Sequence, residues 1–426
     1  MKGIGAGLMG SDIPGLYNMT PEERMKRVML ETGLSVEDVE GISQGGASIS
    51  ILDGMIENVI GTFELPVGIA TNFIMNSTER LIPMAIEEPS VVAAASKAAK
   101  IARINGGFTV STTDQIMIGQ VQICDLEDPG KARDILTGKK QELLKFANSR
   151  DPLLVKFGGG ARDLEFRILD SPVGQMLIVH ILVDTRDAMG ANAVNTMAEA
   201  LAPGLEELTG GKVVLRILSN LAVKRLATAE AIFPKEELGG KEGVDMIMKA
   251  YYLATVDPFR ASTHNKGIMN GVSAVVRATG NDTRAVEAGA HSYASVSGRY
   301  LPLTEYHINE NGDLVGRITL PTAVGLVGGA TRVHPAAKAA IKIMGVKTAS
   351  ELGEVLAAVG LAQNLGALRA LAREGIQRGH MKLHARNLAL QAGASAEEVD
   401  EVVKRLVKSG QVSASMAVNI INDLRK

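Results

Sequence analysis

The sequence is poor in cysteine, with Cys124 the single one among 426 residues. One thiol excludes an intrachain disulfide framework and every zinc site built from several cysteines. Cys124 is expected to be a small buried residue within a strand. Long apolar runs are missing as well, because stretches such as residues 91–95 fall far short of the roughly 18 residues that indicate a membrane-spanning helix. The N-terminus has no basic region followed by an apolar segment, so nothing predicts export.

The sequence also lacks a strong charge of either sign. Its formal net charge is −2, and lysine and arginine are scattered along the chain, which gives no basic footprint for DNA or RNA. Hydrophobic residues make up 46% and charged residues 22%, a profile typical of soluble globular proteins. Because 426 residues exceed what one hydrophobic core usually organises, we expect two domains plus an accessory segment. The default prediction is a cytoplasmic enzyme that binds neither nucleic acid nor membrane.

Two capping boxes open the chain. Thr20 with Glu23 predicts a helix over 21–32, and Ser35 with Asp38 predicts a second, short helix. Further along, the pattern predicts loops and short strands over 53–70, a strand over 81–86 and an alanine-rich helix over 90–104.

The order of elements between about 110 and 220 is β-α-β-β-α-β, which is typical of a ferredoxin-like unit. Strands are predicted over 115–124, 162–169, 176–184 and 212–219, and helices over 130–148 and 190–207. The chain on both sides, 1–109 and 221–374, is mostly helical, with short strands near 301–320. We therefore expect an α+β fold in which a small domain, 110–220, is inserted into a large, mainly helical one.

The last fifty or so residues, 375–426, are predicted to form a third, helical segment. One helix is opened by a capping box from Ser395 to Glu398 and ends near Gly410, and another follows with Ser415 as its cap. We expect them to form a separable flap.

Two motifs are misleading. Gly5, Gly7 and Gly10 satisfy G-x-G-x-x-G, but no strand can precede them, so a Rossmann site is not expected. His380 and His384 are spaced i, i+4 and could lie on one helix face, as metal ligands do. No third ligand is evident nearby, so we expect a structural or acid-base role and no metal.

Two strings place ionisable residues where chemistry could occur, although each has an ordinary structural explanation. In EEPSVVAAAS, Glu88 precedes a helix start, where the helix dipole favours a carboxylate in any case. In DPFRASTHNKGIMNG, Arg260 could grip a carboxylate and Lys266 could polarise a carbonyl, or the string could be a solvated polar loop.

Two further strings combine polar residues with glycine. In ATGNDTRAVEAGAHSYA, Asp282 could be a functional carboxylate or could form an Asx turn. In DAMGANAVNTM, Gly190 could let a ligand phosphate approach a helix N-terminus, or the string could be an ordinary turn and cap. Taken singly, none of the four strings decides a function.

Taken together and in order, these strings resemble hydroxymethylglutaryl-CoA reductase over nearly the whole chain. The matching motifs are ENVIGTFELPVGIA, EEPSVVAAAS, DAMGAN, THNKGIMNG, ATGND, VGLVGGATRVHP and GIQRGHMKLHARN. This combination is very specific. Ala191 in DAMGAN, Ala330 in VGGA and the lack of a membrane anchor resemble the soluble bacterial and archaeal class rather than the anchored eukaryotic one.

The resemblance implies an enzyme that interconverts hydroxymethylglutaryl-CoA and mevalonate plus CoA by two successive hydride transfers with a nicotinamide cofactor. It also implies a homodimer with shared active sites. The large domain would bind the CoA thioester, the inserted domain the cofactor, and the C-terminal segment would be a mobile flap.

The resemblance implies roles for individual residues as well. Lys266 would stabilise the oxyanion, Asp282 would hold and tune that lysine, Glu88 would donate the proton in the aldehyde step, and His380 would protonate the departing CoA thiolate. The hydroxymethylglutaryl end would be bound by Arg260, Ser90 and Asn270. The cofactor would be bound by Asp187, Met189, Gly190, Asn192 and Asn220.

Asp151 matches a position where an acidic residue can accept ribose hydroxyls and repel an added phosphate, so we expect NADH/NAD. Arg150 beside it leaves NADPH/NADP open, since a small rotation could present the cation of this arginine to NADPH instead. The motifs do not fix whether mevalonate is made or degraded. Two other functions stay open: a different acyl-CoA or aldehyde oxidoreductase on the same scaffold, and a non-catalytic descendant.

Overall fold

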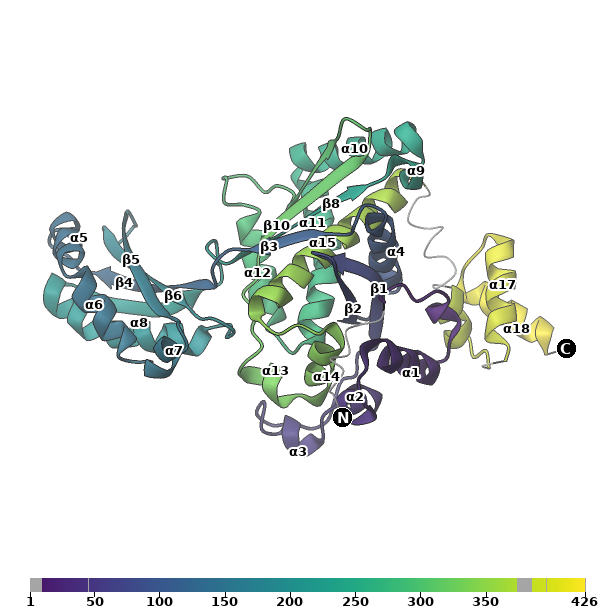
Figure 1. The fold of residues 1–426 in the computed structure, drawn as a ribbon, viewed down its shortest axis with the longest axis horizontal. Helices are drawn as coiled ribbons and strands as arrows, with labels where there is room; N and C mark the ends of the chain where they lie inside the picture. Colours follow the sequence, from purple (N-terminus) through teal and green to yellow (C-terminus); the bar gives the residue numbers. More distant parts are fainter. Residues whose placement is uncertain (1–9, 45, 374–384, 396, 426) are drawn as a thin grey trace, which may run out of the picture.

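The computed structural model describes residues 10–44, 46–373, 385–395 and 397–425. Gly5, Gly7, His380 and His384 lie outside the described residues. The described chain forms a central body, a lobe built from residues 116–219, and a group of C-terminal helices. The lobe and the C-terminal helices lie on opposite sides of the body (Figure 1).

The N-terminal helices begin at the two predicted capping boxes. In α1 (Pro21–Thr32), Thr20 Oγ1 accepts from the Glu23 N–H at 3.2 Å, and the Glu23 carboxylate accepts from the Thr20 N–H at 2.8 Å. The same reciprocal cap starts α2 (Val36–Ser43), which packs against α14 (Pro335–Met344). A 3-10 turn, Leu16–Asn18, precedes them and α3 (Ile49–Leu52) follows.

Two antiparallel sheets lie in the body. The smaller one pairs β1 (Val67–Met75) with β2 (Thr78–Ala85). The larger has the order β3-β8-β10-β9, with β3 (Thr109–Thr112), β8 (Leu226–Phe233), β10 (Leu314–Pro321) and β9 (Thr304–Ile308). Strand β8 is missing from the prediction, because its string LATAEAIF is rich in alanine, a weak strand former. Since β3 pairs with β8, residues 110–112 belong to this sheet rather than to the inserted unit.

Helices surround these sheets. They are α4 (Val91–Arg103), α9 (Lys235–Leu238), α10 (Gly240–Val256), α11 (Pro258–Ala278), α12 (Thr283–Tyr293), α13 (Gly329–Val333), α14 and α15 (Ala349–Arg373). One of them, α15, is long and apolar enough to cross a membrane by length and composition, but 67% of its most apolar window is buried inside the protein. It packs on α4, α10, α11 and β8, which is the position of a core helix.

The inserted lobe has the predicted ferredoxin-like strand order. Its sheet, β5-β6-β4-β7, is antiparallel throughout and is built from β4 (Ile116–Cys124), β5 (Gly160–Leu169), β6 (Met176–Asp184) and β7 (Lys212–Ser219). Its helices are α5 (Pro129–Gly138), α6 (Lys140–Asn148), α7 (Pro152–Lys156) and α8 (Ala191–Thr209). The single helix predicted over 130–148 is wrong, because Lys139, with φ −99° and ψ 5°, ends one helix and begins the next.

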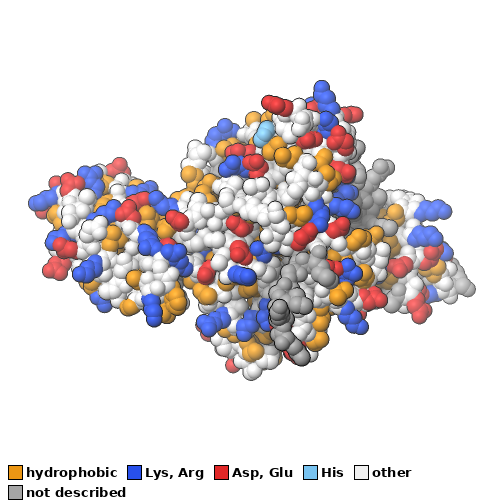
Figure 2. Space-filling view, viewed as in Figure 1, with side chains coloured by type: hydrophobic (Ala, Val, Ile, Leu, Met, Phe, Trp, Pro, Cys, Tyr) orange, Lys and Arg blue, Asp and Glu red, His pale blue; other side chains and the backbone are white. Residues whose placement is uncertain are grey.

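A narrow neck joins the lobe to the body. Residues 113–115 leave the body beside the returning residues 220–225, and the Thr113 Oγ1 hydroxyl donates to the Lys224 carbonyl oxygen at 3.0 Å. Figure 2 shows the lobe as a separate mass carrying blue and red side chains side by side. The lobe also has its own hydrophobic core, centred on residues such as Val179 and Leu201.

The C-terminal helices pack around an apolar cluster of their own. Residues 385–391 are helical, followed by α17 (Val399–Ser409) and α18 (Ala414–Leu424). As predicted, α17 ends at Gly410, which has φ +70°. The predicted cap of the last helix is wrong by two residues, because Ser413 Oγ, rather than that of Ser415, accepts from the Met416 N–H at 3.3 Å.

Shortening a central aromatic side chain of the body should weaken the fold. Phe73 is fully buried and stacks on Phe108 with ring centroids 5.6 Å apart. We expect Phe73→Ala to lower the apparent free energy of unfolding by about 3–5 kcal/mol, since it removes buried surface and leaves a cavity. Urea denaturation followed by circular dichroism measures this, with exposed Phe259→Ala as the matched control. Equal midpoints for the two variants would contradict the prediction.

Candidate active site

The predicted lysine lies on a long amphipathic helix. Helix α11 begins at Pro258, and its cap Asp257 accepts from the Arg260 N–H at 3.1 Å. Residues 257–271 are therefore not the polar loop that the sequence left open. Lys266 is exposed on this helix, and Asn270 lies one turn further along the same face.

Lys266 meets the predicted carboxylate across the fold. Its Nζ atom lies 2.8 Å from Glu88 Oε2, with the two side chains 60% and 35% exposed. Glu88 belongs to the short segment that joins β2 to α4, and both of these elements pack against α11. A second ion pair anchors it, because Glu87 Oε2 lies 3.8 Å from Nη1 of Arg277, three turns beyond Lys266.

Backbone strain marks the same segment. Ser90, the cap residue of α4, has φ +72°, a left-handed conformation that non-glycine residues rarely adopt. Its side chain makes no capping hydrogen bond, so local helix chemistry does not explain the conformation. Strained residues of this kind cluster at functional sites. We call Glu88, Ser90, Lys266 and Asn270 the lysine site.

A cavity lies beside the C-terminal end of α11. It has a volume of about 560 Å³ and lies between residues 46–67 and the helices of the body. Its wall includes Ala85 at the end of β2, Arg277 of α11, and His334. Because Arg277 both lines the cavity and pairs with Glu87, the cavity lies near the segment that carries Glu88, although none of the four residues of the lysine site lines it.

Beneath Lys266, the buried side of α11 is held by a polar network. His264 Nε2 lies 2.7 Å from Thr304 Oγ1, and that hydroxyl and the Tyr306 hydroxyl both donate to Asn364 Oδ1, at 3.1 and 2.9 Å. Burial, aided by the charge of Arg260, lowers the pKa of His264 to about 3. Burial likewise raises the pKa of Tyr306. His264 therefore stays neutral at pH 7 and positions α11 rather than acting as an acid.

Asp282 does not reach Lys266 within this chain. Its Oδ1 atom caps α12 by accepting from the N–H groups of Arg284 and Ala285, at 3.0 and 3.1 Å, and also lies 3.3 Å from Arg284 Nε. Lys266 is separated from the end of α11 at Ala278 by twelve residues, a rise of about 18 Å. The expected pairing of Asp282 with Lys266 is thus not formed in one chain, and the capping explanation describes what Asp282 does here.

Three of the residues expected at the cofactor, Asp187, Met189 and Gly190, lie in the turn 185–190, which joins β6 to α8. Gly190 has φ +101° and precedes a helix whose N-terminus has no side-chain cap, so its free N–H groups suit a phosphate. A Cβ at Gly190 would lie 2.3 Å from Thr185 Cγ2. Position 190 thus requires glycine because of its contact with Thr185. This reason differs from the predicted one, which was that glycine lets a ligand phosphate approach the helix N-terminus. Asn192 is exposed in the first turn of α8.

The two aspartates expected at the cofactor have structural partners. The Asp187 carboxylate accepts from the Ala349 N–H at 2.8 Å, at the start of α15. Asp151 caps α7 by accepting from the Leu154 N–H at 2.9 Å. Asn220 is exposed in the neck. Asp151 thus lies on the lobe, and Asp187 lies at the junction between the lobe and the body.

A buried arginine holds the 185–190 turn and was not predicted from the sequence. Arg225 is fully buried in the neck, and its Nη1 donates to Thr185 Oγ1 at 2.9 Å and to the carbonyls of Ala188 and Met189 at 3.0 and 3.2 Å. Its Nη2 donates to the Val324 carbonyl. Burial lowers the pKa of Arg225 to about 10, against the opposing charges of nearby aspartates. In the sequence, Arg225 lies among mostly apolar residues, and nothing in that string indicates this role.

The segment after Val324 connects the same turn to Asp282. Gly325 packs so closely that an added Cβ would lie 2.5 Å from the Met189 nitrogen. Its own N–H donates to Asn281 Oδ1 at 2.8 Å, and Asn281 directly precedes Asp282. The 185–190 turn and Asp282 therefore form one group within the chain, and the lysine site forms another.

Some expected residues lie outside both groups. Arg260 is half-buried in the first turn of α11, six residues before Lys266 and so on a different face, and burial lowers its pKa. His380 lies outside the described residues. Among residues 10–44, 46–373, 385–395 and 397–425, no cluster of three or more metal-binding side chains is found.

Comparison with known proteins points to one family. A family model described as hydroxymethylglutaryl-coenzyme A reductase matches residues 20–385. The chain is 57% identical over 417 residues to the 3-hydroxy-3-methylglutaryl-coenzyme A reductase of Archaeoglobus fulgidus, covering 98% of this chain and 95% of that protein. It is 38% identical over 391 residues to a probable enzyme of the same name from Borreliella burgdorferi, covering 89% and 88%.

A solved structure agrees with these relatives. The class II 3-hydroxy-3-methylglutaryl-CoA reductase of Streptococcus pneumoniae, bound to NADPH in open conformations, superposes with a TM-score of 0.82 at 42% identity. The match covers 96% of this chain and 100% of that one. The mixed α and β architecture is thus shared with that enzyme.

The buried His264 should make the protein sensitive to acid. Its folded pKa of about 3 lies below its ordinary 6.5, so the unfolded chain binds a proton first, and stability present above pH 6.5 is lost as the pH falls toward 3. We expect His264→Gln to make the loss of unfolding free energy between pH 6.5 and 4 shallower, by up to about 1.4 kcal/mol per pH unit. Urea titrations at a series of pH values measure this. Parallel curves for wild type and variant would refute it.

Proposed function

Because the chain belongs to the hydroxymethylglutaryl-coenzyme A reductase family, we propose that it divides that family's reaction between two half-sites. The protein interconverts hydroxymethylglutaryl-CoA and mevalonate plus CoA by two successive hydride transfers with a nicotinamide cofactor. The observation that carries the residue assignment is the 2.8 Å contact between Lys266 Nζ and Glu88 Oε2.

The lysine site suits a carbonyl that gains negative charge. The Lys266 ammonium would stabilise the oxygen that becomes anionic as hydride reaches the thioester carbon, and would do so again at the aldehyde. Glu88, in contact with that ammonium, would deliver the proton in the aldehyde step. When bound, the cofactor supplies the hydride. His380 would protonate the CoA thiolate from the C-terminal flap.

Substrate and cofactor would occupy different parts of the chain. Arg260, Ser90 and Asn270 are proposed to bind the hydroxymethylglutaryl end, in a body that holds the CoA thioester. The exposed Asn192 and the uncapped N-terminus of α8 support a cofactor site on the lobe. We assign Asp187, Met189, Gly190, Asn192 and Asn220 to that site and expect the enzyme to work in the cytoplasm.

Two copies of the chain would complete each active site. Since Asp282 groups with the 185–190 turn and lies far from Lys266 along α11, a second copy would have to bring its own Asp282 to the lysine site. Exposed apolar side chains support such a dimer. Ile56, Ile60 and Phe63 lie in one loop with their side chains exposed, and a patch of this kind marks a protein interface.

Active-site sharing can be tested by mixing inactive variants. Lys266→Met and Asp282→Asn should each lower kcat by about 100-fold or more, since each removes charge from the reacting centre. Co-expressed, they should recover about a quarter of wild-type activity, because half of the dimers are mixed and each mixed dimer has one intact site.

The matched control pairs Lys266→Met with Glu88→Gln. These two residues touch within one chain, so no mixed dimer contains an intact pair and activity should stay low. Recovery in the control, or none in the first mixture, would contradict the proposed sharing. Mixed dimers can also be purified by giving the two variants different affinity tags. Their activity then tests active-site sharing without contributions from the unmixed dimers.

We propose a preference for NADH, based on Asp151. Arg150 is the residue that could instead favour NADPH. Its guanidinium stacks on another side chain, because Arg150 Cζ lies 4.1 Å from the ring centroid of Phe146. We expect a higher kcat/KM with NADH than with NADPH. Asp151→Asn, which keeps a helix-capping side chain but loses the charge, should shift the ratio toward NADPH by roughly tenfold. A wild-type preference for NADPH of about tenfold, or 1.4 kcal/mol, would rule this out.

A further inference from the structure

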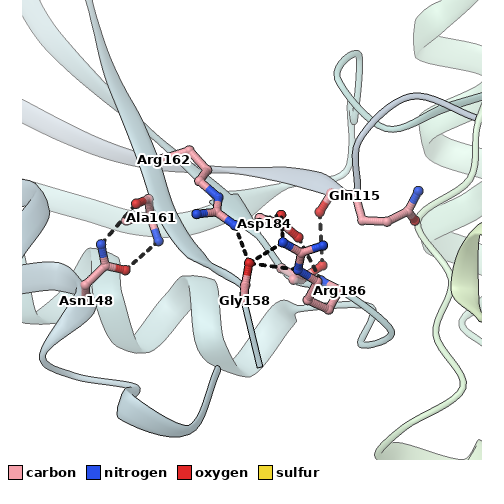
Figure 3. Close-up of polar contacts among 8 residues, drawn as sticks. Gln115, Asn148, Gly158, Ala161, Arg162, Asp184 and Arg186 are labelled. Carbon is pink, nitrogen blue, oxygen red and sulfur yellow. Dashed lines mark hydrogen bonds and ion pairs between the residues drawn. The ribbon is translucent and has the colours of Figure 1, made fainter. Parts of the chain in front are cut away.

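Two arginines of the lobe converge on one carboxylate and one carbonyl (Figure 3). Asp184 Oδ2 lies 3.1 Å from Arg162 Nη2 and 3.2 Å from Arg186 Nη2. Both guanidinium groups also donate to the Gly158 carbonyl oxygen, Arg186 through its Nε at 2.9 Å and both through Nη2. The Arg186 N–H donates to Asp184 Oδ1 at 3.1 Å as well.

The charges of this cluster do not balance. Two guanidinium groups share a single carboxylate, and Gly158 contributes only a neutral carbonyl. Asp184 is 9% exposed, whereas Arg162 and Arg186 are 46% and 49% exposed, so the carboxylate is covered and the cations face solvent. A guanidinium has five N–H groups in a rigid fork, and several on each arginine remain free for an anion.

The backbone is strained where it presents one of these cations. Arg186 has φ +51°, in the left-handed region that a bulky side chain seldom occupies. This conformation turns its side chain back over Gly158, where an added Cβ would lie 3.3 Å from Arg186 Nη2. Folding has to offset the cost, and residues held this way concentrate at ligand sites.

The cluster lies between the two ends of the proposed cofactor site. Asp151, assigned to the ribose, caps the start of the five-residue helix α7, and Gly158 lies two residues beyond the end of that helix. Arg186 lies within the 185–190 turn that leads to α8, next to Asp187. A ligand that runs from Asp151 to the N-terminus of α8 would therefore come close to the two arginines.

From this geometry we infer that Arg162 and Arg186 bind the diphosphate of the nicotinamide dinucleotide, in front of the uncapped N-terminus of α8. The inference rests on the proposed function and deepens it. A planar fork of N–H donors matches phosphate oxygens, and Asp184 with Gly158 holds the forks in place before the ligand arrives. A phosphate on the 2′-hydroxyl would instead lie beside Asp151. The diphosphate is the group that NADH and NADPH share.

Equilibrium binding tests the inference without relying on turnover. Isothermal titration calorimetry of the full-length protein with NADH and with NADPH is compared for wild type, Arg162→Gln and Arg186→Gln. Each variant should bind both cofactors roughly 10- to 100-fold more weakly, the effect of losing a hydrogen bond to a charged group. Arg186→Lys, which keeps the charge but loses the fork, should fall between wild type and Arg186→Gln.

A matched control is Arg167→Gln, an exposed arginine on the same strand as Arg162 that should leave both affinities unchanged. Salt gives a second measurement, since the affinity of wild type for NADH should fall with added NaCl more steeply than that of either Gln variant. The salt dependence still reports whether the two cations contribute to NADH binding, even if a variant has low stability.

The outcomes separate the possible explanations. Unchanged affinity in both Gln variants would overturn the inference, and so would a loss confined to NADPH, which would assign the arginines to the 2′-phosphate. In either case a wild-type protein that binds NADH leaves the proposed function intact. A wild-type protein that binds neither cofactor would instead refute the cofactor site as a whole.

Discussion

A single rigid helix, α11, separates the proposed site residues of this protein into two groups. Lys266 is expected to act on the reacting carbonyl and Asp282 to hold and tune that lysine, yet α11 holds them apart by about 18 Å of helix. An α-helix of this length cannot bend enough to close that gap. The buried contacts of His264 and Asn265 fix the helix further to the strand and loop beneath it. The proposed division into two half-sites, and with it the proposed need for a second copy, rests on this one constraint.

The neck supplies the second constraint. The backbone joins the lobe to the body through two short segments, residues 113–115 and 220–225. Without additional contacts, these two segments would leave the orientation of the lobe relative to the body poorly fixed. Arg225 provides them from a fully buried position, with hydrogen bonds to the 185–190 turn on one side and to Val324 on the other. Because a buried cation without partners is costly, this position is well defined only when both sides are in place. The lobe is thereby coupled to the segment that also contacts Asn281.

Local signals in the sequence were good guides to local structure. Both N-terminal capping boxes, the strand order of the lobe and the glycine end of α17 are as predicted, because each depends on residues close in the chain or on a repeating pattern. Strand β8 was missed, since its pairing with β3 and β10 outweighs the weak propensity of its alanines. The break at Lys139 was missed for a related reason. Apolar periodicity alone does not distinguish one helix from two that pack on the same sheet.

For the site, the motifs by themselves determined the family and the list of candidate residues, since a combination of strings along a whole chain is specific even where each string is ambiguous. Only the tertiary structure decided which of them meet. Glu88 and Lys266 are 178 residues apart and pair at 2.8 Å, while Asp282, much nearer in sequence, does not pair with that lysine. Arg225, Arg162 and Arg186 could not be ranked above other arginines, because their roles come from burial and from partners that other elements supply. Sequence records chemical identity and local preference, whereas distance between side chains is a property of packing.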